Sequence, residues 1–156
     1  MVEAEQVGLK RHVALKFLHA QLTEDPELLK RFLDEARATA SLSHPHIVRV
    51  LDFDVEGGVP WIAYELLPGG TLADLVRDQR QPWELACRQI LQVLGGLEEA
   101  HAHGILHRDI KAQNVLVAAD DTLKLSDFGL AKLDRPEGEQ LTRTGAVMGS
   151  PGYVAP

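Results

Sequence analysis

Three short polar motifs, which follow one another in a fixed order, constrain this chain more than any other feature. The first, Val13–Lys16 (VALK), places a single lysine within an apolar run that is typical of a β-strand. The second, His107–Asn114 (HRDIKAQN), follows a long helical pattern, and the third, Asp127–Gly129 (DFG), begins thirteen residues after Asn114. The expected strand and the two polar motifs are therefore widely separated in the sequence.

Apolar periodicity, capping residues and turn residues predict a mixture of strands and helices. The expected strands are Arg11–Leu18, Ile47–Phe53, Val59–Glu65, Val115–Val117 and Leu123–Ser126. The expected helices run from Pro26 to the break at His44-Pro45, with an apolar face of Leu29, Phe32, Leu33, Ala36 and Ala40, and from about Pro82 to His103. The apolar stripe of the second helix consists of Trp83, Cys87, Ile90, Leu94 and Leu97. We expect Cys87 to lie in the core and the helix to expose some of its apolar surface.

Composition excludes several classes of function. The chain has 156 residues, of which 45% are hydrophobic and 25% charged, as in ordinary globular domains. Its formal net charge of −7 argues against a non-specific nucleic-acid surface. The single cysteine, Cys87, cannot form an intrachain disulfide, and no apolar run is long enough for a membrane span. We expect a cytoplasmic chain that binds no nucleic acid.

The three motifs together, with Glu35 on the intervening helix, are characteristic of protein kinases. Over essentially its whole length the chain resembles the eukaryotic-like serine/threonine protein kinases, most closely the bacterial branch. The resemblance implies an enzyme that transfers the γ-phosphoryl group of ATP to Ser or Thr hydroxyls of protein substrates. Lys111 is the family's mark of Ser/Thr specificity.

The resemblance also implies roles for individual residues. Asp109 would orient the substrate hydroxyl, and Lys111 would steady the transferring phosphoryl group. Lys16 would hold the ATP phosphates and pair with Glu35. Asn114 and Asp127 offer oxygen ligands, which suit Mg²⁺, with Mn²⁺ as an alternative.

A second set of residues would form the adenine site and the regulatory segment. The family's hinge corresponds to Tyr64–Leu67, in which Tyr64 is the gatekeeper and Glu65 and Leu67 contact adenine through the backbone. Ala14 and Leu116 would enclose the ring. We expect Arg108 to pair with a phosphorylated activation loop, with Thr142 and Thr144 as autophosphorylation sites and Ser150 in place of the usual threonine that contacts Asp109 and Lys111.

The expected fold class is α+β, an incomplete two-lobed kinase-like fold. Residues 1–67 would form a small β-rich lobe with one helix and the hinge, and residues 68–156 a partial helical lobe with the catalytic loop and activation segment. The family's Gly-rich loop is not found before Val13, and the last helices of the large lobe are not found after Pro156. The alternative is therefore a catalytically weak or inactive kinase-like module that binds a partner or nucleotide. Dimerisation is left open.

Overall fold

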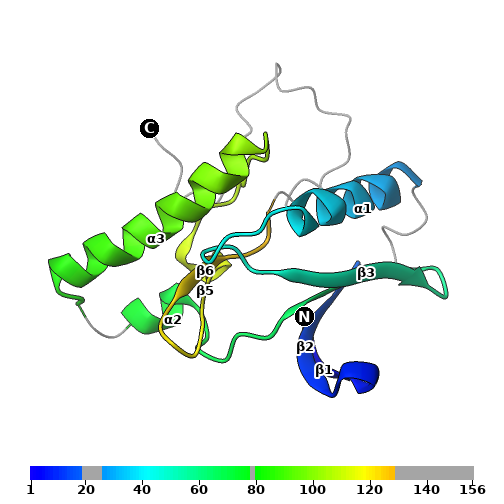
Figure 1. Cartoon of the computed structure of the whole chain (residues 1–156), viewed down its shortest axis with the longest axis horizontal. Coiled ribbons are helices and arrows are strands. Elements are labelled where there is room, and N and C mark those ends of the chain that lie inside the picture. The colour runs from blue at the N-terminus through cyan, green and yellow to red at the C-terminus, as the bar shows by residue number, and fades with distance from the viewer. Residues whose placement is uncertain (19–25, 78–79, 129–156) are drawn as a thin grey trace.

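A four-stranded antiparallel sheet forms one half of the molecule (Figure 1). The structure, a computed structural model, describes residues 1–18, 26–77 and 80–128. The strands lie in the order β1-β2-β4-β3, with β1 Val2–Gln6, β2 Arg11–Phe17, β3 Val50–Glu56 and β4 Val59–Glu65. A short 3-10 helix, η1 Val7–Leu9, joins the first two strands.

Local turn chemistry explains the β3–β4 hairpin. Gly57 and Gly58 connect the strands, and both adopt positive φ values, 58° and 81°, which glycine reaches without steric cost. β4 has the bounds predicted from the sequence, whereas β3 begins at Val50 and not at Ile47. The reason is tertiary, because Ile47 forms an isolated parallel bridge with Leu125 instead of joining the sheet.

Helix α1, Pro26–Ala40, packs along the sheet (Figure 1). Its apolar face buries Phe32 and Ala36 in a cluster with Ala14, Val48 and Ile62. The prediction that Ala40 belongs to this face is wrong, since Ala40 is exposed at the last residue of the helix. The helix also ends before the expected His44-Pro45 break, in a turn where the Ser41 hydroxyl donates to the Ala38 carbonyl at 2.6 Å.

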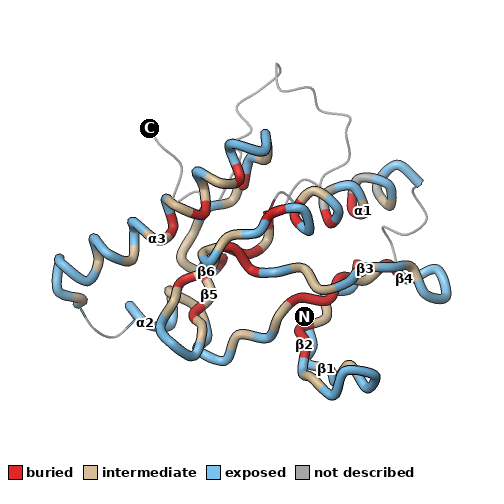
Figure 2. Tube along the Cα trace, in the orientation of Figure 1, coloured by how far each residue is buried: buried red, intermediate tan, exposed pale blue. Residues whose placement is uncertain are grey.

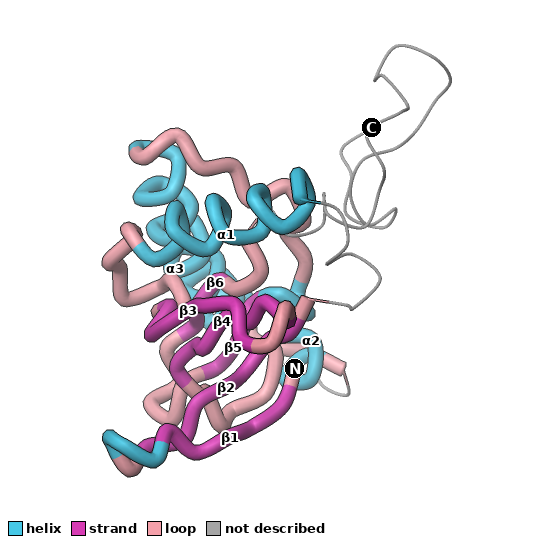
Figure 3. The backbone as a smooth tube through the Cα atoms, turned by 90° about the vertical axis from the view of Figure 1, so that its right-hand side faces the viewer, coloured by secondary structure: helices cyan, strands magenta, loops and turns pink. Residues whose placement is uncertain are grey.

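The second half contains two α-helices and a small hairpin around a separate core (Figure 3). α2 Leu72–Val76 begins with a capping box between Thr71 and Asp74. It is followed by α3 Trp83–Ala102, η3 Ala112–Asn114, β5 Val115–Val117 and β6 Leu123–Leu125. The second core gathers these elements and the loop after α1, through Leu42, Ile47, Val93, Ala100, Val115, Val117, Leu123, Leu125 and Phe128 (Figure 2).

The bounds of α3 match the prediction and much of its apolar surface is exposed, as expected, whereas the prediction that Cys87 lies in the core is wrong. Val93, Gly96 and Ala100 are the buried residues, while Trp83, Cys87, Ile90 and Leu94 are exposed and Leu97 is partly buried. The close approach of α3 to the loop before β3 depends on Gly96, where a Cβ would lie 2.6 Å from the His46 carbonyl oxygen. Within the described residues, no helix is long and apolar enough to cross a membrane.

This arrangement predicts different stabilities for two Leu→Ala substitutions. Leu125→Ala should lower the free energy of unfolding by about 2–5 kcal/mol, because it opens a cavity in the second core. Leu94→Ala should cost less than about 1 kcal/mol, since that side chain is 52% exposed and alanine favours the helix. Urea denaturation followed by circular dichroism measures both, and equal losses would contradict the observed face of α3.

Candidate active site

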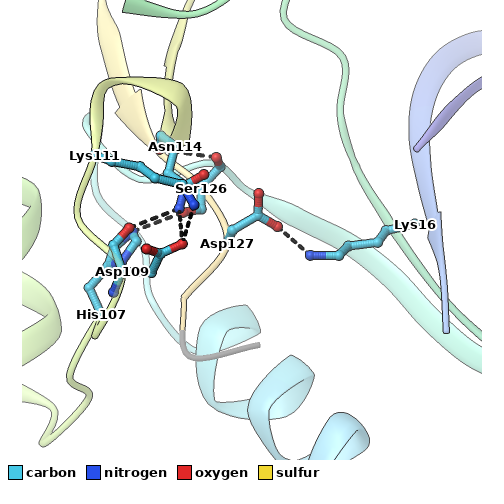
Figure 4. A network of polar contacts seen from close by, with 7 residues as sticks. All are labelled: Lys16, His107, Asp109, Lys111, Asn114, Ser126 and Asp127. Atoms are coloured by element: carbon cyan, nitrogen blue, oxygen red, sulfur yellow. Dashed lines mark hydrogen bonds and ion pairs between the residues drawn. The ribbon is translucent and has the colours of Figure 1, made fainter. Parts of the chain in front are cut away.

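Residues of the three sequence motifs lie close together in the structure (Figure 4). Lys16 extends from β2, and its Nζ forms an ion pair with Oδ1 of Asp127, which follows β6. Both side chains are about three-quarters buried. A lysine from the sheet is thereby brought to a carboxylate that lies 111 residues later in the sequence.

Asp109 is held by two neighbours within its own loop. Lys111 Nζ lies 2.6 Å from Asp109 Oδ2. The Asn114 amide nitrogen donates to the same Oδ2 at 3.0 Å and to the Asp109 carbonyl at 2.8 Å. The Asp109 carboxylate is only 14% exposed, so these partners fix its orientation. The arrangement can hold a carboxylate, an ammonium group and an amide close together at the edge of the helical half.

His107 anchors this loop to the segment before Asp127. His107 is 1% exposed, and its Nε2 pairs with the Ser126 carbonyl at 2.9 Å. Burial lowers the pKa of His107, although the backbone hydrogen bond to Ser126 opposes that shift. Its ring packs against Phe128 with centroids 4.7 Å apart. His107 belongs to the motif His107–Asn114, but the motif alone predicts no role for this residue.

Ser126 completes the connection between the two loops. Its backbone N–H and its hydroxyl both donate to the Asn114 carbonyl, at 2.9 Å and 3.0 Å. Ser126 is therefore bonded to His107 and Asn114, directly before Asp127 (Figure 4). This residue was also missed by the sequence analysis, which found only the flanking motifs.

Two residues of the site hold an uncommon backbone conformation. Arg108 and Asp127 have φ values of 65° and 59°, in the left-handed region that residues other than glycine seldom adopt. Such conformations persist where surrounding contacts determine them, and they concentrate at functional sites. Here His107 and Ser126, each adjacent to one of these residues, are both buried and hydrogen-bonded to each other.

The structure does not test the expected pair between Lys16 and Glu35. Glu35 lies on α1, but its side chain is outside the described part of the chain. Thr142, Thr144 and Ser150 also lie outside the described residues. Arg108 is exposed beside Asp109.

The residues expected around adenine are brought together. Ala14 on β2 is the register partner of Tyr64 on β4, and Leu67 and Leu116 pack against the same buried cluster. The Leu67 backbone makes no hydrogen bond within the residues that the structure describes. The Glu65 side chain points elsewhere, to Lys124 on β6, so any contact of Glu65 with adenine would come from its backbone.

The donor set fits a magnesium ion that also binds phosphate. Asn114 uses its amide nitrogen on Asp109, which leaves its amide oxygen as the atom that could bind a metal. Asp127 adds a carboxylate. Mg²⁺ commonly takes one or two protein oxygens and completes its shell with water and substrate phosphates. Within the described ranges there is no cluster of three or more His, Cys, Asp or Glu side chains that could hold a metal alone.

Comparisons with known proteins agree with this geometry. Residues 2–156 match the family described as the protein kinase domain. The chain is 38% identical over 149 residues to a probable serine/threonine-protein kinase of Clostridium perfringens, and 38% identical over 151 residues to the serine/threonine-protein kinase PknL of Mycobacterium bovis. Among solved structures, the PknI kinase domain of Mycobacterium tuberculosis superposes with a TM-score of 0.71 at 32% identity.

The matches cover nearly all of this chain but only part of its relatives. The Clostridium and M. bovis alignments include 95% and 96% of this chain, yet 22% and 37% of those proteins. The PknI superposition covers 82% of this chain and 53% of that kinase domain. The incomplete α+β fold expected from the sequence is confirmed by this partial superposition.

Proposed function

The chain belongs to the protein kinase domain family, and from this premise we propose that it carries the catalytic centre of an ATP-dependent protein serine/threonine kinase. The reaction is transfer of the γ-phosphoryl group of ATP to Ser or Thr hydroxyls of protein substrates. The single observation that carries this proposal is the convergence of Asp109, Lys111, Asn114 and Asp127 with Lys16 from the opposite half of the molecule (Figure 4).

Each of these side chains has a role that its contacts support. Asp109 accepts a hydrogen bond from the substrate hydroxyl and orients it for in-line attack. Lys111, 2.6 Å from Asp109, stabilises the negative charge of the transferring group. Phosphoryl transfer depends mainly on such positioning and charge neutralisation, because the protein forms no covalent bond with the phosphate.

ATP would lie between the sheet and the two loops. Ala14 and Leu116 enclose adenine, and the backbones of Glu65 and Leu67 bind its edge. Asn114 and Asp127 would hold Mg²⁺, with Mn²⁺ as the alternative, and the metal would neutralise negative charge on the phosphates. Binding of the nucleotide would replace the direct Lys16–Asp127 pair, since the lysine turns to the phosphates and the carboxylate to the metal. Glu35 on α1 would then fix the direction of Lys16.

A phosphoryl-transfer assay tests the proposal. The protein is incubated with [γ-³²P]ATP, Mg²⁺ and a library of serine- and threonine-containing peptides, and phosphoamino acids are identified after hydrolysis. Phosphoserine or phosphothreonine is the expected product. Nucleotide binding without transfer would instead support the alternative, a kinase-like module that binds ATP or a partner without turnover.

The same proposal includes a cytoplasmic location and a division of the chain into two lobes, at residues 1–67 and 68–156.

We further predict autophosphorylation at Thr142 or Thr144, or at both. Arg108, which is exposed next to Asp109, would pair with a phosphothreonine and thereby raise activity. Phosphopeptide mapping of active protein should find the modification, and the double variant Thr142→Ala/Thr144→Ala should lose most of the activity. Full activity with both threonines unmodified would contradict the prediction.

Ser150, which follows these threonines in the sequence, is proposed to contact Asp109 and Lys111.

A further inference from the structure

The side chain of Glu65 joins three segments of the molecule. Glu65 is the last residue of β4, and both of its carboxylate oxygens accept from Lys124 Nζ on β6, at 2.8 Å and 2.9 Å. The backbone N–H of Arg49 donates to the same carboxylate at 2.8 Å. The Glu65 and Lys124 side chains are 26% and 19% exposed, so solvent screens this pair less than an exposed ion pair.

Lys124 occupies a particular register in the β5–β6 hairpin. It is the direct partner of Leu116, which packs against the cluster of Ala14, Tyr64 and Leu67. These are the residues proposed to surround adenine. The Glu65–Lys124 ion pair therefore connects the end of β4 to the β5–β6 hairpin. The backbone at the end of β4 would bind the adenine edge, and the hairpin would contact one face of the ring through Leu116.

The ion pair is not what holds the two halves together. The loop before β3 is bonded to β6 through its backbone, from Val48 N–H to the Leu125 carbonyl and from Leu125 N–H to the His46 carbonyl, both at 2.9 Å. Beside these bonds lies a cavity of about 300 Å³, lined in part by His44, Glu65 and Lys124. Loss of the pair should therefore leave the fold intact and allow small changes in the distance between β4 and the hairpin.

We propose that Glu65 and Lys124 form a positioning pair, which sets the separation between the two walls of the adenine site and thereby the affinity for ATP. This inference rests on the proposed function, because it concerns the same nucleotide site. Lys124 acts through Leu116 and Glu65 and touches neither ATP nor the protein substrate. A preorganised site binds more tightly than one that must be ordered by its ligand.

The test combines single and exchanged variants. Lys124→Met is expected to raise the KM for ATP, and the Kd of a non-hydrolysable ATP analogue, by about fivefold, with kcat changed less than about twofold. Glu65→Lys should have a similar or larger effect. The double variant Glu65→Lys/Lys124→Glu should recover most of the lost affinity, which a loss of packing alone would not allow. Thermal denaturation should show all four proteins folded.

Arg77→Met provides the matched control, because it removes an ion pair with Asp74 whose side chains are 68% and 48% exposed. It should leave the KM and Kd unchanged. If the unsubstituted protein binds the analogue and Lys124→Met binds it equally well, the positioning role is wrong while the proposed function stands. Affinity lost in both single variants and not recovered in the exchanged pair would also overturn it. Absence of nucleotide binding by the unsubstituted protein would overturn both.

Discussion

Replacing Asp109 with asparagine is expected to lower the rate of phosphoryl transfer by about 10²–10⁴-fold. Asparagine keeps the size of the side chain and one oxygen, so it can still accept from the Asn114 amide, which lies 3.0 Å from Asp109 Oδ2. It loses the negative charge that faces Lys111 and the capacity to accept the proton of the substrate hydroxyl. The substitution therefore tests the chemistry of the carboxylate with little change in its geometry.

The measurement is the initial rate at saturating ATP and peptide, together with the Kd of a non-hydrolysable ATP analogue. The rate should fall while the Kd changes less than about threefold, because Asp109 contacts the hydroxyl and not adenine. Asp54→Asn is the control, since Asp54 is exposed on β3 and its Oδ1 accepts from the Val55 N–H, a contact that asparagine keeps. Transfer by the Asp109 variant at a rate near that of the control would remove Asp109 from the mechanism.

The loop His107–Asn114 is recognisable in the sequence because its polar residues lie in one short motif. Asp109, Lys111 and Asn114 lie within six residues of one another, so one tight loop brings them together. The ion pair between Lys16 and Asp127 is not predicted from the sequence, since no periodicity indicates a contact between residues 111 positions apart. The resemblance implies a Lys16–Glu35 pair, which stays a prediction because the Glu35 side chain lies outside the described part of the chain.

The predictions from sequence are wrong where a tertiary contact, and not the local sequence, determines the structure. Ile47 and Val48 are β-branched residues typical of a strand, yet they pair with Leu125 of β6 and β3 begins only after them. Periodicity along α3 finds apolar residues on several sides of the helix, but it cannot identify the side that meets the hairpin. That choice depends on Gly96, whose missing side chain permits the contact with His46. The Glu65–Lys124 pair is missed for the same reason, because its partners are 59 residues apart.

Asp127→Asn is the second substitution with a large expected effect, a loss of about a hundredfold or more in transfer rate. The carboxylate is proposed to hold the metal that neutralises the phosphates, and in the structure it also pairs with Lys16. An amide is a weaker ligand for Mg²⁺ than a carboxylate, since it carries no net charge. Affinity for the ATP analogue should therefore fall in the presence of Mg²⁺ and change little in EDTA, as isothermal titration calorimetry can measure.

The effect of the substitution on backbone strain can be separated from its effect on metal binding, because the chain offers a matched control at Asp121. Asp127 and Asp121 both adopt left-handed φ values, 59° and 63°, a region in which asparagine is readily accommodated. Asp121 is exposed in the turn between β5 and β6, and Asp121→Asn should leave both the rate and the Mg²⁺ dependence unchanged. If Asp127→Asn shows the same Mg²⁺ dependence of nucleotide affinity as the unsubstituted protein, then Asp127 does not hold the metal. In that case its pairing with Lys16 would be structural, and the proposed metal site would have to be abandoned.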